Sequence, residues 1–306
     1  MRIESPYHEG ERLVQERAGE RGRADINGRV IGSAIPVPAL GFIGQQQMAV
    51  MTSIDRDSRP WASLSFGDPG FIAAKTTQQI DIDLVEASRH KDDPFWQNIA
   101  ADDRIGLLLI ELATRRRLRI SGRVSIGAES LSLAVERAYP NCPKYIQRRH
   151  LTKRSKARIE PLAEPIHGKA LAPEQQMMIE MADTLFVASL HPEHGADASH
   201  RGGRPGFVQV TSPTTIRIPD YAGNSMFNTL GNFAVHPSGG ILIPDFAGQR
   251  TLQLAGEVEL RWDLDDPDQV TGGTRRFWDF NIVETLELPL PIEAAWEFLD
   301  ASPFNP

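Results

Sequence analysis

The sequence is poor in cysteine, because Cys142 is the only one among 306 residues. A single cysteine excludes a disulfide framework within the chain and any cysteine-rich zinc or iron–sulfur site. Long apolar runs are lacking too, since the purest one, residues 107–110, is far shorter than the ~20 residues of a membrane-spanning helix. The first thirty residues carry many Arg and Glu side chains and no apolar stretch, so we expect no signal peptide. These absences predict a cytoplasmic protein that does not insert into a membrane.

An excess of positive charge is also lacking. The chain has 40 acidic and 33 basic side chains and a formal net charge of −7, which argues against a general nucleic-acid binder. Its length is about twice the ~150 residues typical of one domain, so we expect two units or one large one. Against this acidic background, any local cluster of basic side chains needs a reason.

The sequence contains an internal repeat. Residues 106–124 align without a gap with residues 240–258, at an offset of 134, and seven of the nineteen positions are identical. Residues 63–82 align in the same way with residues 199–218, at an offset of 136. Two blocks in the same order at nearly the same offset indicate an internal duplication.

The repeat predicts five segments along the chain. We expect an N-terminal arm, a first domain, a helical basic connector, a second domain and a C-terminal tail, at residues 1–35, 36–126, 127–172, 173–290 and 291–306. Each domain has short apolar stretches separated by turns and one helical stretch, which favours a small β-barrel over a βαβ sheet. In the connector, the apolar spacing of residues 129–139 predicts a helix that ends at Pro140. The predicted fold class is mainly β, with two tandem barrels and short helices.

The two copies differ in polar residues at two places. The second copy combines cations with glycines where the first has neither arrangement, at His200, Arg201, Gly202 and Arg204. At the start of the helical stretch, the first copy has Asp93, whereas the second has Asn224 and Ser225, which suit a helix N-cap. A helix N-terminus with spare N–H groups binds anions, and Asp93 would repel them. The second copy is therefore predicted to bind a phosphate, and the first copy is not.

Other residues of the second copy extend this candidate site. Asn228 and Asn232 would add uncharged donors along the same helix. Arg250 follows in the next hairpin, but its counterpart Arg116 in the first copy makes a structural role equally plausible. The alternative for the whole region is a basic hairpin beside an ordinary helix cap.

Several stretches resemble the FMN-binding split-barrel superfamily of pyridoxamine 5′-phosphate oxidase-like proteins, and in particular a bacterial group with two fused barrels. They are residues 5–11, 140–146, 199–207, 219–232 and 250–256. The resemblance implies six-stranded antiparallel barrels with FMN in a groove between two of them. It assigns phosphate contacts to Arg201, Asn224, Ser225 and Asn228, with His200 and Tyr221 as neighbours. Trp278 would meet the flavin ring or lie in the core. The residues around it depart from the oxidase signature, which argues against pyridoxamine phosphate as substrate.

The resemblance implies an FMN-dependent oxidoreductase that acts on an unidentified small molecule. NADH or NADPH is a candidate electron donor, and a homodimer is the expected assembly. The alternative is a non-catalytic split-barrel protein that holds flavin or haem, and a third option is a deazaflavin as cofactor.

A few further features have competing interpretations. We expect no metal site from His191, His194 and His200, because no cysteine or aspartate stands at ligand spacing. Cys142 is expected to be structural, with a reactive thiol as the alternative. The basic run at residues 144–158 is expected to be solvated, with contact to a phosphate-bearing ligand as the alternative. The turn at residues 115–117 is interpreted as edge protection, or as a segment that reaches the phosphate groove.

Overall fold

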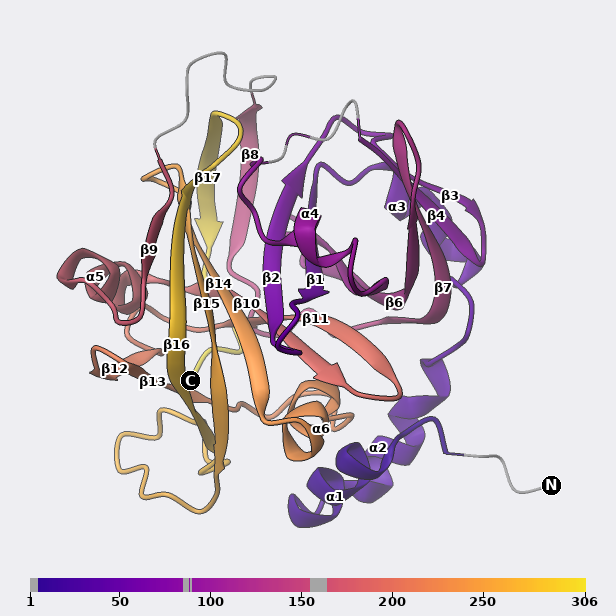
Figure 1. The fold of residues 1–306 in the computed structure, drawn as a ribbon. Helices are drawn as coiled ribbons and strands as arrows, with labels where there is room; N and C mark the ends of the chain where they lie inside the picture. Colours follow the sequence, from indigo (N-terminus) through magenta and orange to yellow (C-terminus); the bar gives the residue numbers. More distant parts are fainter. Residues whose placement is uncertain (1–4, 85–87, 89, 155–163) are drawn as a thin grey trace.

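The chain forms two large antiparallel sheets that lie next to each other, and a small third one, in the computed structural model, which describes residues 5–84, 88, 90–154 and 164–306 (Figure 1). The first sheet has the strand order β2-β1-β5-β6-β7-β4-β3. Its strands are β1 (Met48–Ile54), β2 (Pro60–Phe66), β3 (Ile72–Thr76), β4 (Gln79–Asp83), β5 (Arg104–Glu111), β6 (Arg116–Ile126) and β7 (Ser130–Pro140).

The second sheet repeats this topology. Its order, β11-β10-β14-β15-β16-β13-β12, is that of the first sheet strand for strand, and the short strand β9 (Ile166–Gly168) is added beside β16. Its strands are β10 (Thr184–His191), β11 (Gly195–Gly202), β12 (Gln209–Ser212), β13 (Thr215–Pro219), β14 (Ser238–Asp245), β15 (Arg250–Arg261) and β16 (Phe277–Pro289). The predicted fold of two tandem, mainly β split barrels is confirmed, with seven strands on each sheet path rather than six.

Short helices complete the described structure. They are α1 (Glu9–Arg17), α2 (Arg21–Asn27), α3 (Leu40–Gly44), α4 (Phe95–Asn98), α5 (Pro173–Met181) and α6 (Asn228–Val235), with 3₁₀ turns η1 (Gly28–Val30) and η2 (Val37–Ala39). The N-terminal arm packs α1 against α6 of the second barrel, as Figure 1 shows at the bottom of the molecule. Among the described residues, no helix has the length and apolar character required to cross a membrane.

The two barrels meet through equivalent strands. β5 of the first barrel packs on β11 of the second, and β14 of the second packs on β2 of the first. Each contact depends on a glycine from the repeat. A Cβ on Gly106 would lie 2.6 Å from the backbone nitrogen of Ala198, and a Cβ on Gly240 would lie 2.4 Å from the carbonyl oxygen of Pro60. Only glycine permits so close an approach of two backbones.

The predicted connector helix is wrong. Residues 130–140 form β7, which belongs to the first sheet, so the first barrel extends beyond the predicted boundary at residue 126. Leu131, Leu133 and Val135 are buried, and their spacing of two residues places them on one face of a strand. The sequence analysis interpreted these apolar residues as helical spacing, whereas they repeat every two residues, as in a strand.

The basic run that follows contains a second strand. β8 (Arg148–Arg154) pairs with β17 (Ala294–Asp300) from the C-terminal tail in a separate two-stranded sheet. Three of its basic side chains are paired. Arg148 pairs with Asp300 at 2.9 Å, Arg149 with Asp183 at 2.6 Å, and Arg154 with Asp68. Residues 155–158 of the run lie outside the described residues.

Candidate functional site

A pocket lies between the two barrels. Its walls come from β5 and β6 of the first barrel, from residues 141–145, and from β11 and the start of α6 in the second barrel. It holds about 820 Å³ of space not filled by atoms, part of it open to solvent. Seven predicted site residues line it, namely His200, Arg201, Gly202, Tyr221, Asn224, Ser225 and Asn228. The pocket is thus built from both copies of the repeat, and the charge of its walls decides what it can hold.

Two guanidinium groups in this pocket lack a carboxylate partner. Among the described residues, neither Arg117 nor Arg201 forms an ion pair. Arg117 donates through Nε to the carbonyl oxygen of Cys142 at 2.9 Å, and its Nη1 lies 3.3 Å from Nδ1 of His200. Arg201 donates through Nη1 to the carbonyl oxygen of His200, while its buried Nε has no partner. Burial lowers the pKa of Arg117 to about 10, so the group remains a cation at neutral pH. Two unpaired cations favour an anionic ligand.

The unpaired buried atoms of the pocket are mostly donors. Burial lowers the pKa of His200 well below its usual value, so the ring is neutral. Because its Nδ1 accepts from Arg117, the proton resides on Nε2, which is buried and has no partner. Nδ2 of Asn141 and Nε of Arg201 are likewise buried and unpaired donors, and Oδ1 of Asn228 is an unpaired acceptor. Buried polar groups are normally satisfied, so these donors fit an anion that accepts several hydrogen bonds.

The start of α6 adds backbone donors. The residue at its N-cap is Phe227, in the left-handed region with φ 57°, and no side chain caps the helix. The prediction that Asn224 or Ser225 caps this helix is wrong, because the chain makes one more tight turn before α6 begins. Ser225 also has a positive φ of 63°. Left-handed backbone at two such residues is costly and is commonly retained at binding sites.

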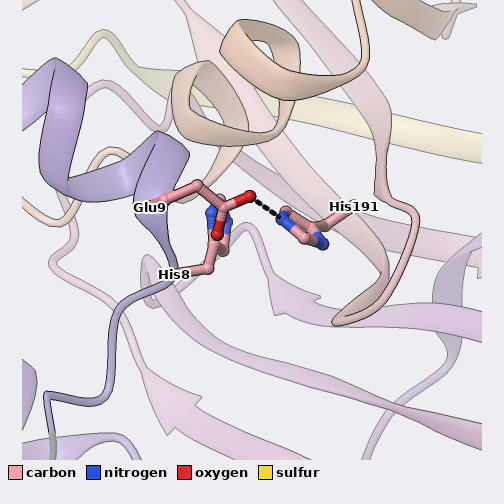
Figure 2. A group of neighbouring side chains, drawn as sticks. All are labelled: His8, Glu9 and His191. Atoms are coloured by element: carbon pink, nitrogen blue, oxygen red, sulfur yellow. Dashed lines mark hydrogen bonds and ion pairs between the residues drawn. The ribbon is translucent and has the colours of Figure 1, made fainter.

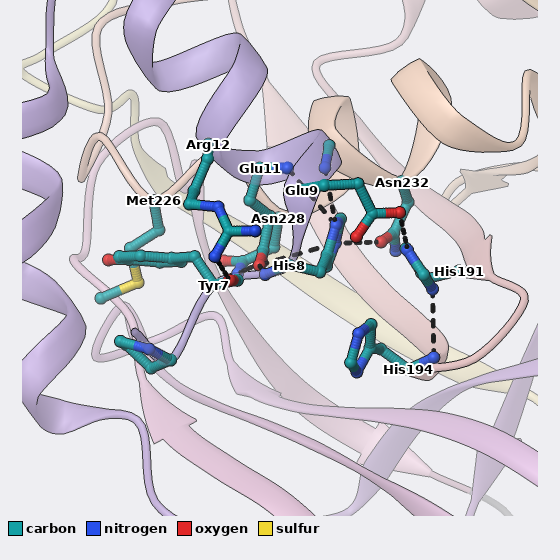
Figure 3. Close-up of polar contacts among 12 residues, drawn as sticks. Tyr7, His8, Glu9, Glu11, Arg12, His191, His194, Met226, Asn228 and Asn232 are labelled. Atoms are coloured by element: carbon teal, nitrogen blue, oxygen red, sulfur yellow. Dashed lines mark hydrogen bonds and ion pairs between the residues drawn. The ribbon is translucent and has the colours of Figure 1, made fainter. Parts of the chain in front are cut away.

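Two predicted phosphate donors are already engaged by the N-terminal arm, and Figure 3 shows one of them, Asn228, beside Glu11. Oγ of Ser225 donates to a carboxylate oxygen of Glu20, and Nδ2 of Asn228 donates to a carboxylate oxygen of Glu11. Glu11 is only 1% exposed, and burial raises the pKa of its carboxyl. The arm therefore fixes the start of α6 from the side, and the free donors of the pocket are those of Arg117, Arg201, His200 and Asn141.

The first barrel carries its own carboxylate at the equivalent place. Oδ1 of Asp93 accepts from the backbone N–H of Phe95 at 2.9 Å, and Oδ1 of Asn224 accepts from that of Met226 at 3.0 Å. The same turn thus contains a carboxylate in one copy and a neutral amide in the other. Asp93 is buried and also accepts from Nε2 of Gln253 across the barrel interface at 2.8 Å. The charge difference that the sequence comparison singled out is present in the structure.

Four predicted residues lie away from the pocket. One of them, Asn232, does not line it and donates through Nδ2 to Oγ of Ser189. Arg204 is exposed and does not line it. Arg250 pairs with Asp245 and Glu287 at 3.0 and 2.8 Å, beside a different groove. Trp278 is 0% exposed and belongs to the apolar core of the second barrel, which corrects its assignment to the flavin ring. An aromatic side chain at this point of β16 faces inward by the alternation of the strand.

Gly202 has a packing role rather than the expected one. A Cβ at this position would lie 2.1 Å from the carbonyl oxygen of Tyr145, so the glycine lets residues 141–145 approach β11. Those residues were found by resemblance alone, and their pocket-lining members Asn141, Lys144 and Tyr145 were not predicted as site residues. Arg117 was only an alternative at the sequence level, since nothing local shows that β6 faces the other barrel.

A histidine cluster near the arm is explained without a metal (Figure 2). The candidate ligand atoms of His8, Glu9 and His191 lie within 4.8 Å of one another. In both histidines, however, Nδ1 accepts from backbone N–H groups, which places the proton on Nε2. Nε2 of His8 then donates to Oδ1 of Asn232, and Nε2 of His191 donates to Glu9, both at 3.0 Å. No free lone pair is left for a cation on either ring. His191, His194 and His200, from which no metal site was expected, do not form one group, because His200 lies in the pocket.

Comparison with known proteins places the first barrel in a family. Residues 39–161 match the family model described as pyridoxamine 5′-phosphate oxidase. These residues therefore belong to the pyridoxamine 5′-phosphate oxidase-like family. The match covers the barrel with Asp93, and it includes β5, β6 and residues 141–145, which form one wall of the pocket. The match does not extend to the second barrel, whose strands follow the same order as those of the first.

Among solved structures, three similar ones are small proteins that each match about two fifths of this chain. A candidate pyridoxamine 5′-phosphate oxidase from Lactobacillus delbrueckii is 13% identical, with a TM-score of 0.32, covering 40% of this chain and 98% of its own. HupZ from group A Streptococcus is 10% identical, with a TM-score of 0.30, covering 43% and 99%. A pyridoxamine 5′-phosphate oxidase-related, FMN-binding protein from Nostoc punctiforme is 13% identical, with a TM-score of 0.27, covering 44% and 100%. No curated protein matches the chain.

Proposed function

We propose that the protein is an FMN-dependent oxidoreductase that binds the phosphate of FMN in the pocket between its two barrels. The observation that carries the proposal is the pair of unpaired guanidinium groups, Arg117 from the first barrel and Arg201 from the second, beside the uncapped start of α6. A phosphate dianion satisfies two guanidinium groups and a helix N-terminus together. Family membership of the first barrel supports a flavin rather than another phosphate compound.

Each group has a defined role in this proposal. Arg117 and Arg201 bind and orient the phosphate, and the neutral His200 donates from Nε2. Asn141 supplies a further amide donor from the segment between the barrels. When bound, FMN supplies the hydride or electron transfer, and the protein contributes orientation and electrostatics. No nucleophile or general base is required of the chain for this chemistry.

Purified protein tests the proposal through its colour and its titration with FMN. We expect absorbance near 450 nm as isolated, or quenching of flavin fluorescence when FMN is added to colourless protein. Protein that binds no FMN under either condition contradicts the proposal. A haem spectrum or preferential uptake of a deazaflavin would identify a different cofactor in the pocket.

Catalysis is tested separately from binding. Anaerobic addition of NADH or NADPH to the flavin-loaded protein should bleach the flavin, and oxygen or a substrate should restore the colour. A flavin that no nicotinamide donor reduces would favour a binding protein over an enzyme that uses NAD(P)H. A homodimer remains a prediction, which light scattering of the loaded protein measures directly.

A further inference from the structure

Cys142 lies in the pocket rather than in the core of a connector. It is half-buried and lines the same cavity as Arg117 and Arg201. Nη2 of Arg117 approaches the sulfur to 3.9 Å, while Nε of the same side chain holds the carbonyl oxygen of Cys142. The sulfur therefore lies beside a cation that lines the same cavity, so an anion drawn to Arg117 comes within reach of the thiol.

The same cavity shows independent signs of a ligand. His200 is 4% exposed, and its Nε2 has no partner. Asn228 is 5% exposed, and its Oδ1 has none. Both residues line the pocket that Cys142 lines. A small molecule bound by these groups therefore shares one cavity with the half-buried thiol.

We propose that Cys142 is a site of mixed-disulfide formation with small disulfides that carry carboxylates, which Arg117 recruits. The Cys142 thiolate attacks one sulfur of the small disulfide, a new sulfur–sulfur bond forms, and the old one breaks. The second half of the small disulfide leaves as a thiolate, so Cys142 is oxidised and the leaving half is reduced. Arg117 acts before the exchange, by drawing the carboxylate into the pocket.

Two disulfide probes of different charge test the recruitment. Dithiobis(nitrobenzoate) carries two carboxylates, whereas dithiodipyridine is neutral, and both release a coloured thiol that is followed at fixed pH. Because Cys142 is the only cysteine, the native chain should release one equivalent, and Cys142→Ser should release none. Arg117→Gln should lower the ratio of the anionic rate to the neutral rate about tenfold. Arg56→Gln, at an exposed arginine of the β1–β2 turn, should leave this ratio unchanged.

The comparison of rates separates recruitment from other effects. A change in thiolate fraction alters both probes alike, so an equal loss with both in Arg117→Gln would overturn recruitment. Release that requires urea would overturn the site itself. Arg117→Lys retains the charge and should keep most of the ratio. Circular dichroism shows whether each variant is folded, and reaction with the neutral probe shows that Cys142 is accessible in it.

One consequence rests on the proposed function: the adduct and FMN should exclude each other. FMN should slow modification of the wild-type protein by dithiobis(nitrobenzoate), and the modified protein should bind FMN at least tenfold more weakly. If the protein binds no FMN while the probe ratio still depends on Arg117, the proposed function fails and the thiol site stands. If FMN binds and the ratio does not depend on Arg117, the thiol proposal fails alone.

Discussion

Arg201 and Arg117 combine a positive charge, partial burial and the absence of a carboxylate, a combination that is costly unless a ligand supplies the counter-charge. Chains normally pair such groups, as Arg119, which also lines this pocket, does with Asp197. The sequence identified Arg201 because the first copy has a neutral residue there. It offered Arg117 only as an alternative, because only the packing of β6 against the other barrel turns that side chain into the pocket.

Removing either guanidinium should weaken flavin binding. Arg201→Gln and Arg117→Gln should each raise the Kd for FMN about 10- to 100-fold, since a hydrogen bond to a charged group contributes about 1.5–3 kcal/mol. Fluorescence titration measures the effect. Arg204→Gln is the matched control, because this arginine is exposed and lies outside the pocket. Equal losses in all three variants would show that general charge, not this site, attracts FMN.

Asp93 should weaken the fold at neutral pH. Burial raises the pKa of its carboxyl, so stability is lost as pH rises from the unfolded-state pKa through the folded-state one. In Asp93→Asn, Oδ1 can still accept from Phe95 and Ser63, and the new amide can donate to the unpaired Oε1 of Gln253. At pH 8, we expect the free energy of unfolding of the variant to exceed that of the wild type by about 1 kcal/mol. This difference should decrease at acid pH. Urea titrations at several pH values test this, and a gain that grows in acid would contradict it.

At the scale of elements, α1 and α6 pack together, and the N-terminal arm fixes the start of α6, which lines the pocket. His8 caps α1 and reaches Asn232 on α6, and a Cβ on Gly10 would lie 2.2 Å from the carbonyl oxygen of Gly231, so the helices touch through glycines. The sequence predicted an arm laid over the body and the helix that became α6. It did not predict that the arm would supply carboxylates to Ser225 and Asn228, because those contacts span about 200 residues of chain.

Acid should release this arm. Burial, together with the neighbouring His191 and Arg137, lowers the pKa of His8 to about 3. Stability from the neutral ring is complete above the unfolded-state pKa near 6.5 and is lost as pH falls toward 3. We expect the protection factors of the α1 amides, which correct the exchange rates for their intrinsic pH dependence, to fall between pH 6.5 and 4.5.

His8→Asn provides the control for this pH effect. Asparagine is also an N-cap acceptor, but it does not titrate. In the wild-type protein, His8 contributes up to about 1.4 kcal/mol per pH unit to the slope of the free energy of α1 opening against pH, and the variant should lack this contribution. Glu11 faces the same cluster and has a raised pKa, so its opposite contribution remains in both proteins and cancels in the comparison. Identical pH profiles in the two proteins would contradict the role of His8.

At the scale of the molecule, two like barrels form one interface. The repeat predicted the common topology, because aligned glycines and apolar residues determine strands and close contacts in both copies. The contact of the barrels with each other could not be predicted from the sequence. The need for glycine at positions 106 and 240 is evident only once the backbone of the other barrel is seen to approach each of them. The helix predicted at residues 129–139 shows the same limit at shorter range, because β7 acquires its strand partners from far along the chain.

Alanine at either interface glycine should disrupt this arrangement. Gly240→Ala brings a methyl group to 2.4 Å from a backbone oxygen, and Gly106→Ala brings one to 2.6 Å from a backbone nitrogen. We expect each to lower the free energy of unfolding by about 1–3 kcal/mol and to weaken FMN binding, because the pocket walls separate. Gly22→Ala meets nothing within 4 Å and should not weaken binding. Full FMN affinity in Gly240→Ala would show that the pocket does not depend on this interface.

The central claim is that the phosphate of FMN lies between the barrels, held by one guanidinium from each. A crystal structure of the protein grown with FMN tests this claim most directly. We predict phosphate oxygens within hydrogen-bond distance of both Arg117 and Arg201, with the flavin in the same pocket. A phosphate beside Asp93, or an Arg201 side chain that faces solvent while FMN is bound elsewhere, would contradict the account.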